Sequence, residues 1–482
     1  MDAVADRVRP PAPPRPADDS LSPRAPLFRP PAPEPRPTPL GPIGLLRVLK
    51  NNPIECWARE HFEAPIVTAS RALGHVVLIN EPAAIGRVLL ENAANYRKDT
   101  LQQRVLSAGL ANGLLSAEDE QWRTQRRTLA PMFSRRTVTS FAPAMMEAAN
   151  ALVARWHTHA DGSPIDVAAE MTRITLDVLV RTIFSDGLGC DAEALRAAMA
   201  TYFETIGRID PLDLFGVPDF VPRLSRLRVR PALRFFDTAI DEIIATRRRR
   251  LGRDPGGVPN DILTLLLNAL DPDTGHRMTE VEVRANILTF IAAGHETTAN
   301  CLSWSLFLLA RSAEWREGVA AEARREVDGP ISGLADRLVL TRAVIEEAIR
   351  LYPPIAAISR VATGPDELAG VAIRRGSMVV IAPYVLHRHR RLWTDPDHFD
   401  PHRFLGEARA TIERFAYLPF GAGMRTCIGS AFALQEAALV LATIMKHFTL
   451  KLVPEHRVWP LLRVTLRPAG GLPMTIARRR PN

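Results

Sequence analysis

The hydrophobic positions of this chain recur mostly at the three- and four-residue spacing of helices, and only short stretches alternate as strands do. The alternation predicts strands at Ile66–Thr68 and His75–Ile79. The longest helical pattern runs from about Thr279 to Arg311, which at 1.5 Å per residue gives a helix of roughly 50 Å. Helices are also expected at Pro82–Asn92, Glu120–Phe133, Ala142–His157, Val167–Phe184, Ala192–Ile206, Pro231–Arg250, before Pro353-Pro354 and at Ser430–His447, with a strand-like stretch at Val371–Pro383. The pattern therefore predicts a mainly α fold with a small β-rich region to one side.

The first 42 residues differ sharply from the rest, because they hold 14 of the 40 prolines. Proline removes a backbone donor and cannot continue a helix, and this stretch has no apolar core that would mark a signal or transit peptide. We therefore expect residues 1–42 to form a disordered, proline-rich tail and residues 43–482 to form a single domain. An arm that docks a partner is the alternative for the tail.

Composition narrows the class of protein. Of the 482 residues, 46% are hydrophobic and 24% charged, and no apolar run reaches the 18–20 residues of a membrane-spanning helix. The net charge of +8 comes from arginine, since only four of the 61 basic residues are lysines, and no nucleic-acid-binding motif accompanies it. The four cysteines are too few for a disulfide scaffold and lack CxxC spacing, so we expect a reducing, cytoplasmic location: Cys56, Cys190, Cys301 and Cys427.

One of these cysteines stands in an unusual loop. Phe420–Gly429 reads FGAGMRTCIG, with three glycines around Cys427 immediately before a helical pattern. Glycine permits positive φ and close approach of the backbone, so amide groups can point at the sulfur. The helix that starts near Gly429 is expected to lower the pKa of the thiol further. A structural cysteine beside a turn would explain Cys427 but not the whole pattern.

This loop resembles the cysteine loop of the cytochrome P-450 family of haem-thiolate proteins. The resemblance implies a cytochrome P-450 fold, a haem b cofactor, and Cys427 as the axial ligand of the haem iron. It also implies that Arg425 pairs with a haem propionate and that Phe420 and Gly421 lie against the haem.

Further motifs follow in the order of the family. Glu347 and Arg350 form an ExxR pair ahead of Tyr352-Pro353-Pro354, and Arg403 lies in a PxRF segment; the resemblance implies that these three charges form a buried structural triad.

Other arginines resemble the family's haem contacts. Trp122 and Arg126 match a WxxxR helix, and both could reach a propionate, as could Arg360. His387 and Arg388 also lie at a recurrent place, and their role is left open.

The long helix carries the family's oxygen-activation pattern at 293–298, AGHETT. A threonine hydroxyl can bond the carbonyl four residues earlier, here that of Ala293, and Gly294 would ease the resulting distortion of the helix. The resemblance implies that Thr297 positions dioxygen and a water, and that Glu296 delivers protons. His295 is expected to face away from Thr297.

An acid and a threonine together favour an O₂-dependent monooxygenase. Only 55 residues follow Cys427, so electrons are expected from a separate ferredoxin or flavodoxin with its reductase. Arg123, Arg126 and Arg127 could form its docking face, or they could bind only propionate and solvent. The alternatives are a haem-thiolate isomerase, dehydratase or peroxygenase, and a non-catalytic haem sensor.

The substrate pocket is expected, by family position, to draw on several separate segments. They are largely apolar and indicate a lipophilic small molecule of terpenoid, fatty-acyl or polyketide type. The expected segments and residues are Asp99–Leu115, Tyr202–Val221, Phe290, Ala293, Ile355 and Ala356 in the stretch Ile355–Ile358, and Arg467–Pro473.

Overall fold

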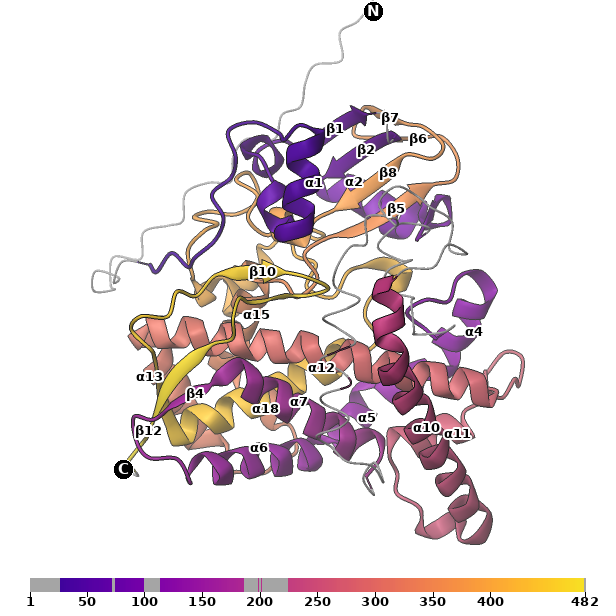
Figure 1. Cartoon of the computed structure of the whole chain (residues 1–482), viewed down its shortest axis with the longest axis vertical. Helices are drawn as coiled ribbons and strands as arrows, with labels where there is room; N and C mark the ends of the chain where they lie inside the picture. Colours follow the sequence, from indigo (N-terminus) through magenta and orange to yellow (C-terminus); the bar gives the residue numbers. More distant parts are fainter. Residues whose placement is uncertain are drawn as a thin grey trace, which may run out of the picture.

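The computed structural model describes residues 27–71, 74–98, 113–185, 198, 201 and 224–480. Helices make up most of this part of the chain, and a small sheet region lies at one end, at the top of Figure 1. The mainly α fold with a minor β region is thus confirmed. None of the described helices combines the length and the apolarity needed to cross a membrane.

The sheet region joins the beginning of the chain to its last third. β1 (Ile66–Arg71) and β2 (Gly74–Ile79) form the expected hairpin, with Ile66 opposite Ile79. β8 (Met378–Ile381) runs parallel to β2, and β5 (Ile358–Ala362) and β3 (Tyr96–Arg97) complete the order β1-β2-β8-β5-β3. This arrangement places Arg360 on β5, opposite Val379.

The long helix α12 (Glu280–Arg311) is the centre of the helical part. Thr279 begins it with a capping box, in which the Thr279 N–H donates to Glu282 Oε2 over 2.9 Å. α12 is buried over most of its length because α7 (Val167–Ile183), α15 (Val339–Leu351) and α18 (Ser430–His447) surround it. A helix that is buried on most sides can hold residues of a central site rigidly.

The other described elements cover this core. The three-stranded sheet has the order β4-β12-β9, and two hairpins pair β6 with β7 and β10 with β11. The remaining helices and strands are α1 (Pro42–Asn51), α2 (Pro82–Gly86), α4 (Asp119–Leu129), α5 (Arg135–Ser140), α6 (Ala142–Trp156), α10 (Leu224–Arg253), α11 (Ile262–Asn268), α13 (Ala313–Glu326), α14 (Leu334–Arg337), α16 (Pro383–Leu386), α17 (Gly406–Ala410), β4 (Pro164–Asp166), β6 (Asp366–Leu368), β7 (Val371–Ile373), β9 (Phe448–Leu452), β10 (Pro460–Leu462), β11 (Leu466–Pro468) and β12 (Pro473–Arg478).

Most element boundaries agree with the sequence pattern to within a few residues, with three differences. The strand-like stretch expected at Val371–Pro383 is two strands of different sheets, β7 and β8, followed by the start of α16. α10 begins before Pro231 and continues through it, so the expected start at that proline is wrong. The helix expected over Pro82–Asn92 is α2 followed by one π-helical turn at Arg87–Glu91. Apart from residues 198 and 201, the helix expected at Ala192–Ile206 lies outside the described residues.

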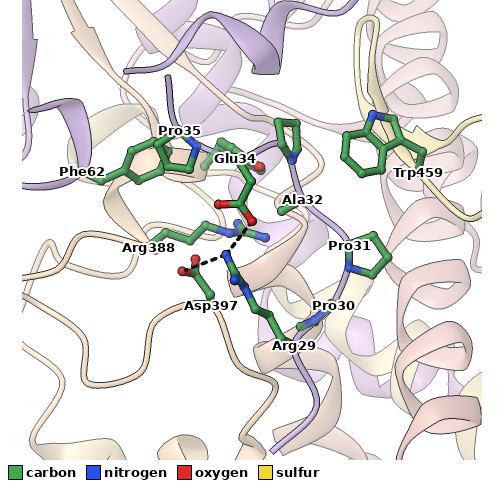
Figure 2. A pocket seen from close by; sticks show the side chains of 12 residues that line it. Arg29, Pro30, Pro31, Ala32, Glu34, Pro35, Phe62, Arg388, Asp397 and Trp459 are labelled. Atoms are coloured by element: carbon green, nitrogen blue, oxygen red, sulfur yellow. Dashed lines mark hydrogen bonds and ion pairs between the residues drawn. The ribbon is translucent and has the colours of Figure 1, made fainter. Parts of the chain in front are cut away.

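Residues 27–41 of the proline-rich beginning of the chain pack against the domain (Figure 2). The Phe28 ring meets that of Phe307 on α12, with centroids 6.1 Å apart. The Tyr352 hydroxyl donates to the carbonyl of Pro31 over 2.8 Å. The expectation of a disordered tail through residue 42 is therefore wrong for residues 27–41, because the prolines that prevent a helix leave carbonyls and rings that pack on the domain. Residues 1–26 lie outside the described residues.

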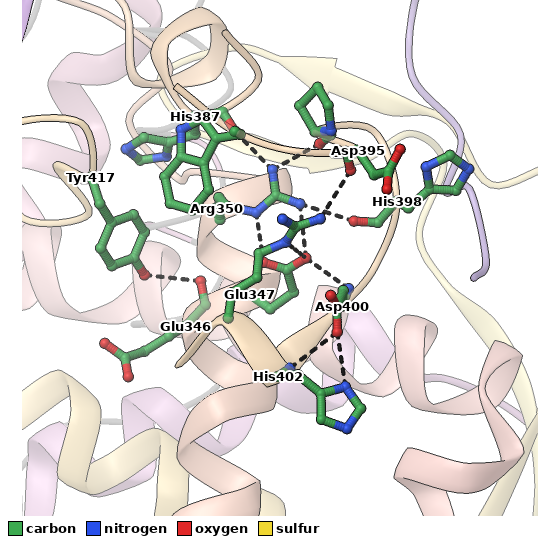
Figure 3. Close-up of polar contacts among 12 residues, drawn as sticks. Glu346, Glu347, Arg350, His387, Asp395, His398, Asp400, His402 and Tyr417 are labelled. Atoms are coloured by element: carbon green, nitrogen blue, oxygen red, sulfur yellow. Dashed lines mark hydrogen bonds and ion pairs between the residues drawn. The ribbon is translucent and has the colours of Figure 1, made fainter. Parts of the chain in front are cut away.

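A buried network of charges holds the segment that precedes the cysteine loop (Figure 3). Arg350 donates to both carboxylate oxygens of Glu347, over 2.6 and 2.8 Å, and both side chains are fully buried. Arg350 also donates to the carbonyls of His387, Pro396 and His398. Arg403 lies 3.6 Å from Glu347 and donates to the carbonyls of Thr394 and Asp395. The expected triad of Glu347, Arg350 and Arg403 is confirmed.

Candidate functional site

A cavity of about 400 Å³ lies between α12 and the loop that contains Cys427. α12 contributes Phe290, Ala293, Thr297 and Cys301 to its wall, and the cysteine loop contributes residues 418–422 and 425–429. The wall is mostly apolar, with a group of basic side chains among the lining residues. The cavity therefore brings together two motifs that lie 130 residues apart in the sequence.

The cysteine loop turns its sulfur toward this cavity. The Cys427 N–H donates to the carbonyl of Phe420 over 2.9 Å, which closes the loop. Gly421 and Gly423 have φ of +71° and +70°, which favours glycine at both positions. A Cβ on Gly423 would lie 1.8 Å from the carbonyl oxygen of Leu89, so no other residue fits there. The glycines are thus needed for the course of the loop.

The thiol of Cys427 differs from the expectation in one respect. Burial raises its pKa, and the Gly429 N–H and the charge of Arg126 oppose this effect without overcoming it. The prediction of a lowered pKa is therefore wrong for the protein alone, because desolvation outweighs the donors that the loop supplies.

Four basic side chains line the cavity beside the loop. They are Lys98, Arg126, Arg360 and Arg425, and burial lowers the pKa of each. The pKa of Lys98 falls to about 7, with repulsion by Arg425 and Arg360 adding to the effect of burial. One carboxylate, that of Glu118, is near enough to lie 3.0 Å from Arg425. Among the described residues, these basic groups outnumber the acid that pairs with them, so this wall can bind further negative charge.

Arg425 and Trp122, which belong to two separate motifs, lie together. The Arg425 guanidinium stands 4.0 Å from the centroid of the Trp122 ring and donates to the carbonyl of Ala117 over 2.8 Å. Arg360 donates to the carbonyl of Ser359, and Arg126 lines the cavity from α4. Lys98 was not singled out in the sequence, because a lone lysine outside any motif carries no signal.

The Thr297 hydroxyl donates to the carbonyl of Ala293 over 2.7 Å, as predicted. α12 nevertheless runs from Glu280 to Arg311 without a break. Gly294 has a different reason to be glycine than the one expected, since a Cβ there would lie 3.1 Å from Leu179 Cδ2 on α7. The glycine allows close helix packing.

Glu296 is 8% exposed and lies beside the cavity. Its Oε1 is 3.7 Å from Arg467 Nη1, and its Oε2 has no hydrogen-bond partner among the described residues. Burial raises its pKa, against the effects of Arg467 and Thr465. Thr465 lines the cavity and accepts a hydrogen bond from Asn300 over 2.9 Å. The acid thus stands between a partly exposed arginine and a residue of the cavity wall.

His295 points away from the cavity, as expected. It is 4% exposed, and its carbonyl accepts a hydrogen bond from Thr175 on α7. Burial lowers the pKa of its imidazole to about 4, so the ring is neutral at pH 7.

The far end of the cavity is apolar, with Phe290 against Phe133 at a centroid distance of 5.1 Å. Ile355 lines the cavity as expected, but Ala356 does not. Ala356 is buried, and its carbonyl accepts the N–H of Tyr384, which turns its methyl into the core.

Two expected segments contribute differently. Val464 and Thr465, rather than the turn Arg467–Pro473, line the cavity. Of Asp99–Leu115, the described residues Leu114 and Leu115 line it, and residues 99–112 and 202–221 lie outside the described residues.

Asn286 fixes the segment that carries Leu114. Its Oδ1 accepts the N–H of Leu114 over 2.9 Å, and its Nδ2 donates to Gln125 on α4 over 3.3 Å. A Cβ on Gly113 would lie 2.4 Å from Thr289 Oγ1 and 2.6 Å from the carbonyl oxygen of Ala285. The sequence gave no signal for this contact, because it joins three elements.

His387 connects the buried network to the cysteine loop. Burial, with Arg350 and Arg388 adding to it, lowers the pKa of His387 to about 3. The neutral ring accepts the N–H of Leu418 at Nε2 over 2.8 Å. His387 therefore fixes the cysteine loop at Leu418, the residue where the loop enters the cavity wall.

Two arginines of the expected docking face are engaged elsewhere. Arg123 pairs with Glu120 at 3.0 Å, and Arg127 pairs with the buried Asp271 at 2.8 Å. Arg126 faces the cavity. These three residues therefore form no common free basic surface.

Comparisons with known proteins agree on one family. The family model described as Cytochrome P450 matches residues 30–472. Cyclooctatin synthase of Streptomyces melanosporofaciens is 34% identical over 408 residues, which cover 83% of this chain and 85% of that protein. Pentalenene oxygenase of Streptomyces avermitilis is 32% identical over 379 residues, 77% of this chain and 81% of that protein.

The fold gives the same result. A crystal structure of a cytochrome P450DA heme domain superposes with a TM-score of 0.80 at 27% identity, over 94% of this chain and 99% of that one. With the family model matching most of the sequence, the chain belongs to the cytochrome P450 family and is a monooxygenase of that family.

Proposed function

We propose that this protein binds haem b through Cys427 and uses O₂ to oxidise a lipophilic terpenoid. The single observation that carries the proposal is the shared cavity, in which the sulfur of Cys427 and the Thr297 segment of α12 meet beside four basic side chains. When bound there, the haem would supply the iron at which O₂ is activated, and the Cys427 thiolate would hold that iron.

The residues present fit this cofactor. Lys98, Arg126, Arg360 and Arg425 would bind its two propionates, because their charge exceeds that of Glu118. The Trp122 ring supports Arg425 through a cation–π contact. Phe420 and Gly421 would lie along the haem face, where Gly421 presents no side chain.

The cavity wall contains a second cysteine that could in principle bind the haem iron. Cys301 on α12 also lines the wall, and burial raises the pKa of its thiol to about 12. Cys427 has the Gly429 N–H and the charge of Arg126 to stabilise a thiolate. We therefore assign Cys427 as the ligand of the haem iron, and Cys301 as a residue that packs in the wall.

Proton delivery is assigned to Glu296 and Thr297. Burial raises the pKa of Glu296, which favours its protonated form, and Arg467, one-third exposed, connects the acid to solvent. The Thr297 hydroxyl would orient a water in the cavity while it donates to Ala293. Thr297 would thereby fix where protons enter the cavity.

The substrate class rests on the lining and on the relatives. Phe290, Ala293 and Ile355 leave an apolar space that suits a hydrocarbon skeleton. Pentalenene oxygenase, by its name, oxidises pentalenene. We assign this chain a terpenoid substrate, with electrons from a separate ferredoxin or flavodoxin and its reductase.

An optical titration of purified protein tests the proposal. Ferric protein is titrated with cyclic terpene hydrocarbons and, as a comparison, with fatty acids; a low- to high-spin shift is expected with the terpenes.

The reduced carbon monoxide complex of Cys301→Ser should keep the thiolate band, and that of Cys427→Ser should lose it. Retention of the band in Cys427→Ser would remove the proposed ligand. Product formed with peroxide alone, and unaffected by Thr297→Ala, would contradict the O₂-dependent mechanism.

A further inference from the structure

A second threonine joins the acid of the long helix to the cavity. The described lining of the cavity includes Thr297 and Thr465 but not Glu296. The Thr465 side chain forms a hydrogen bond with the carboxyl of Glu296, and this contact opposes the effect of burial on the pKa of the acid. Thr465 therefore connects Glu296 to the cavity wall.

Thr297 is already engaged as a hydrogen-bond donor. A hydroxyl carries one proton and two acceptor sites, and the proton of Thr297 goes to the carbonyl of Ala293 over 2.7 Å. In this arrangement Thr297 can accept a hydrogen bond from a water, but it has no further proton to donate. A route for protons from Glu296 into the cavity therefore needs another hydroxyl.

The hydroxyl of Thr465 has the complementary arrangement. Its oxygen accepts a hydrogen bond from Asn300 Nδ2 over 2.9 Å, and that bond does not use the hydroxyl proton. Thr465 is 2% exposed. The next residue, Leu466, is fixed on both sides, because its N–H donates to the carbonyl of Pro354 over 2.9 Å and its carbonyl accepts the indole N–H of Trp304 over 3.1 Å. The Thr465 hydroxyl is thus held firmly at the cavity wall with its proton available.

The solvent side of the acid is formed by the same strand. Arg467 on β11 is one-third exposed, and its Nη1 lies 3.7 Å from Glu296 Oε1. Arg467 is the charged group that acts on the pKa of the acid. His295, the residue before it, is neutral at pH 7, and Thr175 on the adjacent helix α7 brings no charge. Glu296 therefore lies between a residue that reaches solvent and one that reaches the cavity.

We propose that Thr465 passes protons from Glu296 to a water in the cavity, while Thr297 holds that water. The protonated carboxyl gives its proton to the hydroxyl oxygen of Thr465, and this hydroxyl gives its own proton to the water. Glu296 is left as a carboxylate and takes a new proton from solvent beside Arg467, so Thr465 is unchanged after each transfer. This inference rests on the proposed O₂-dependent function, and it assigns a residue outside the motif at 293–298.

Infrared spectra of the ferric, haem-loaded protein test the contact without turnover. The C=O stretch of the protonated Glu296 carboxyl is identified by its loss in Glu296→Gln and is followed against pH. Thr465→Val removes a hydroxyl that stabilises the carboxylate, so the midpoint of this titration should move to higher pH. Thr465→Ser should restore the wild-type midpoint. An unchanged midpoint in Thr465→Val overturns the proposal.

Turnover tests the transfer itself, with the terpene that gives the largest spin shift. In wild type, the product formed per consumed reductant should fall as pH rises, because ionised Glu296 has no proton to give. In Thr465→Val this ratio should be about tenfold lower and should no longer depend on pH, and Thr465→Ser should recover both properties. A Thr465→Val variant that keeps the wild-type ratio and its pH dependence also overturns the proposal.

Thr175→Val is the matched control. Thr175 is a buried threonine that donates to the carbonyl of His295, beside Glu296 but outside the cavity lining. This variant should keep the wild-type ratio and pH dependence, and an equal loss in it would overturn the proposal. Haem absorbance and the thermal midpoint check the fold, and Thr465→Ala replaces Thr465→Val if valine lowers either.

The outcome for wild type separates the two proposals. Absence of product from wild type would contradict the proposed function. Product from wild type and equally from Thr465→Val would contradict only the role of Thr465.

Discussion

Single hydroxyl and carboxyl groups carry most of the chemistry proposed for this cavity. Thr297 lines the cavity, and its hydroxyl is held by the hydrogen bond that it donates to the carbonyl of Ala293. Glu296, the residue immediately before Thr297, instead lies near Arg467. Of these two neighbouring residues of α12, Thr297 therefore faces the cavity and Glu296 faces the partly exposed Arg467.

Replacing Thr297 by alanine should separate electron use from product formation. Without the hydroxyl, water is no longer oriented, and the product formed per electron pair is expected to fall about tenfold or more while peroxide rises. Thr297→Ser keeps the bond to Ala293 and should stay near wild type. The ratio of product to consumed reductant measures this. An unchanged ratio in Thr297→Ala would contradict the assigned role.

Glu436 gives a prediction about pH. It is fully buried on α18, neither carboxylate oxygen has a partner among the described residues, and burial raises its pKa well above the usual value. The unfolded chain ionises near pH 4.5, and the folded chain ionises only at higher pH. The free energy of unfolding should therefore fall as pH rises above about 4.5.

Glu436→Gln removes this titration, so it is expected to be more stable than wild type at pH 8 by about 1–3 kcal/mol and similar to it at pH 4. Chemical denaturation followed by circular dichroism at both pH values measures the difference. The exposed Glu314→Gln serves as the control and should change little. A variant equally stabilised at both pH values would mean that ionisation is not the cause.

Between elements, residues 113–115 approach α12 closely in the cavity wall. Gly113→Ala would place a Cβ within 2.6 Å of α12 backbone and should cost about 1–3 kcal/mol by overpacking. The displaced Leu114 should also weaken the spin shift with terpenes. Gly252→Ala, where no atom lies within 4 Å, is the matched control and should be neutral or slightly stabilising. An unaltered terpene titration for Gly113→Ala would show that this contact does not shape the site.

Several elements were predictable because their signals are local. Capping of α12 at Thr279, termination of α15 before two prolines, and the turn of the cysteine loop all depend on residues close in sequence. The start of α10 could not be predicted in this way. Helix formation on both sides of Pro231 outweighs the loss of the one hydrogen bond that proline removes.

Across the whole molecule, the buried network around Arg350 ties α15 to the segment before the cysteine loop (Figure 3). Arg350→Lys keeps the charge but satisfies fewer acceptors, so we expect a loss of about 3–5 kcal/mol and of bound haem. Arg123→Lys, at an exposed pair, should stay within about 0.5 kcal/mol of wild type. For both variants, the haem content measures the loss of cofactor, and denaturation curves measure the change in the free energy of unfolding. Full haem occupancy in Arg350→Lys would show that the network does not support the loop.

The sequence by itself determined the family, the order of its motifs, the hydrogen bond of Thr297 and the direction of His295, because each depends on spacing along one helix or one loop. The tertiary structure decided what depends on distant neighbours. It raised the pKa of Cys427 by burial, added Lys98 to the basic wall, turned Ala356 into the core and paired Arg127 with Asp271. It also packed the prolines of residues 30–35 against the domain, beside Arg388. Desolvation and pairing are properties of the packed molecule, and no local pattern contains them.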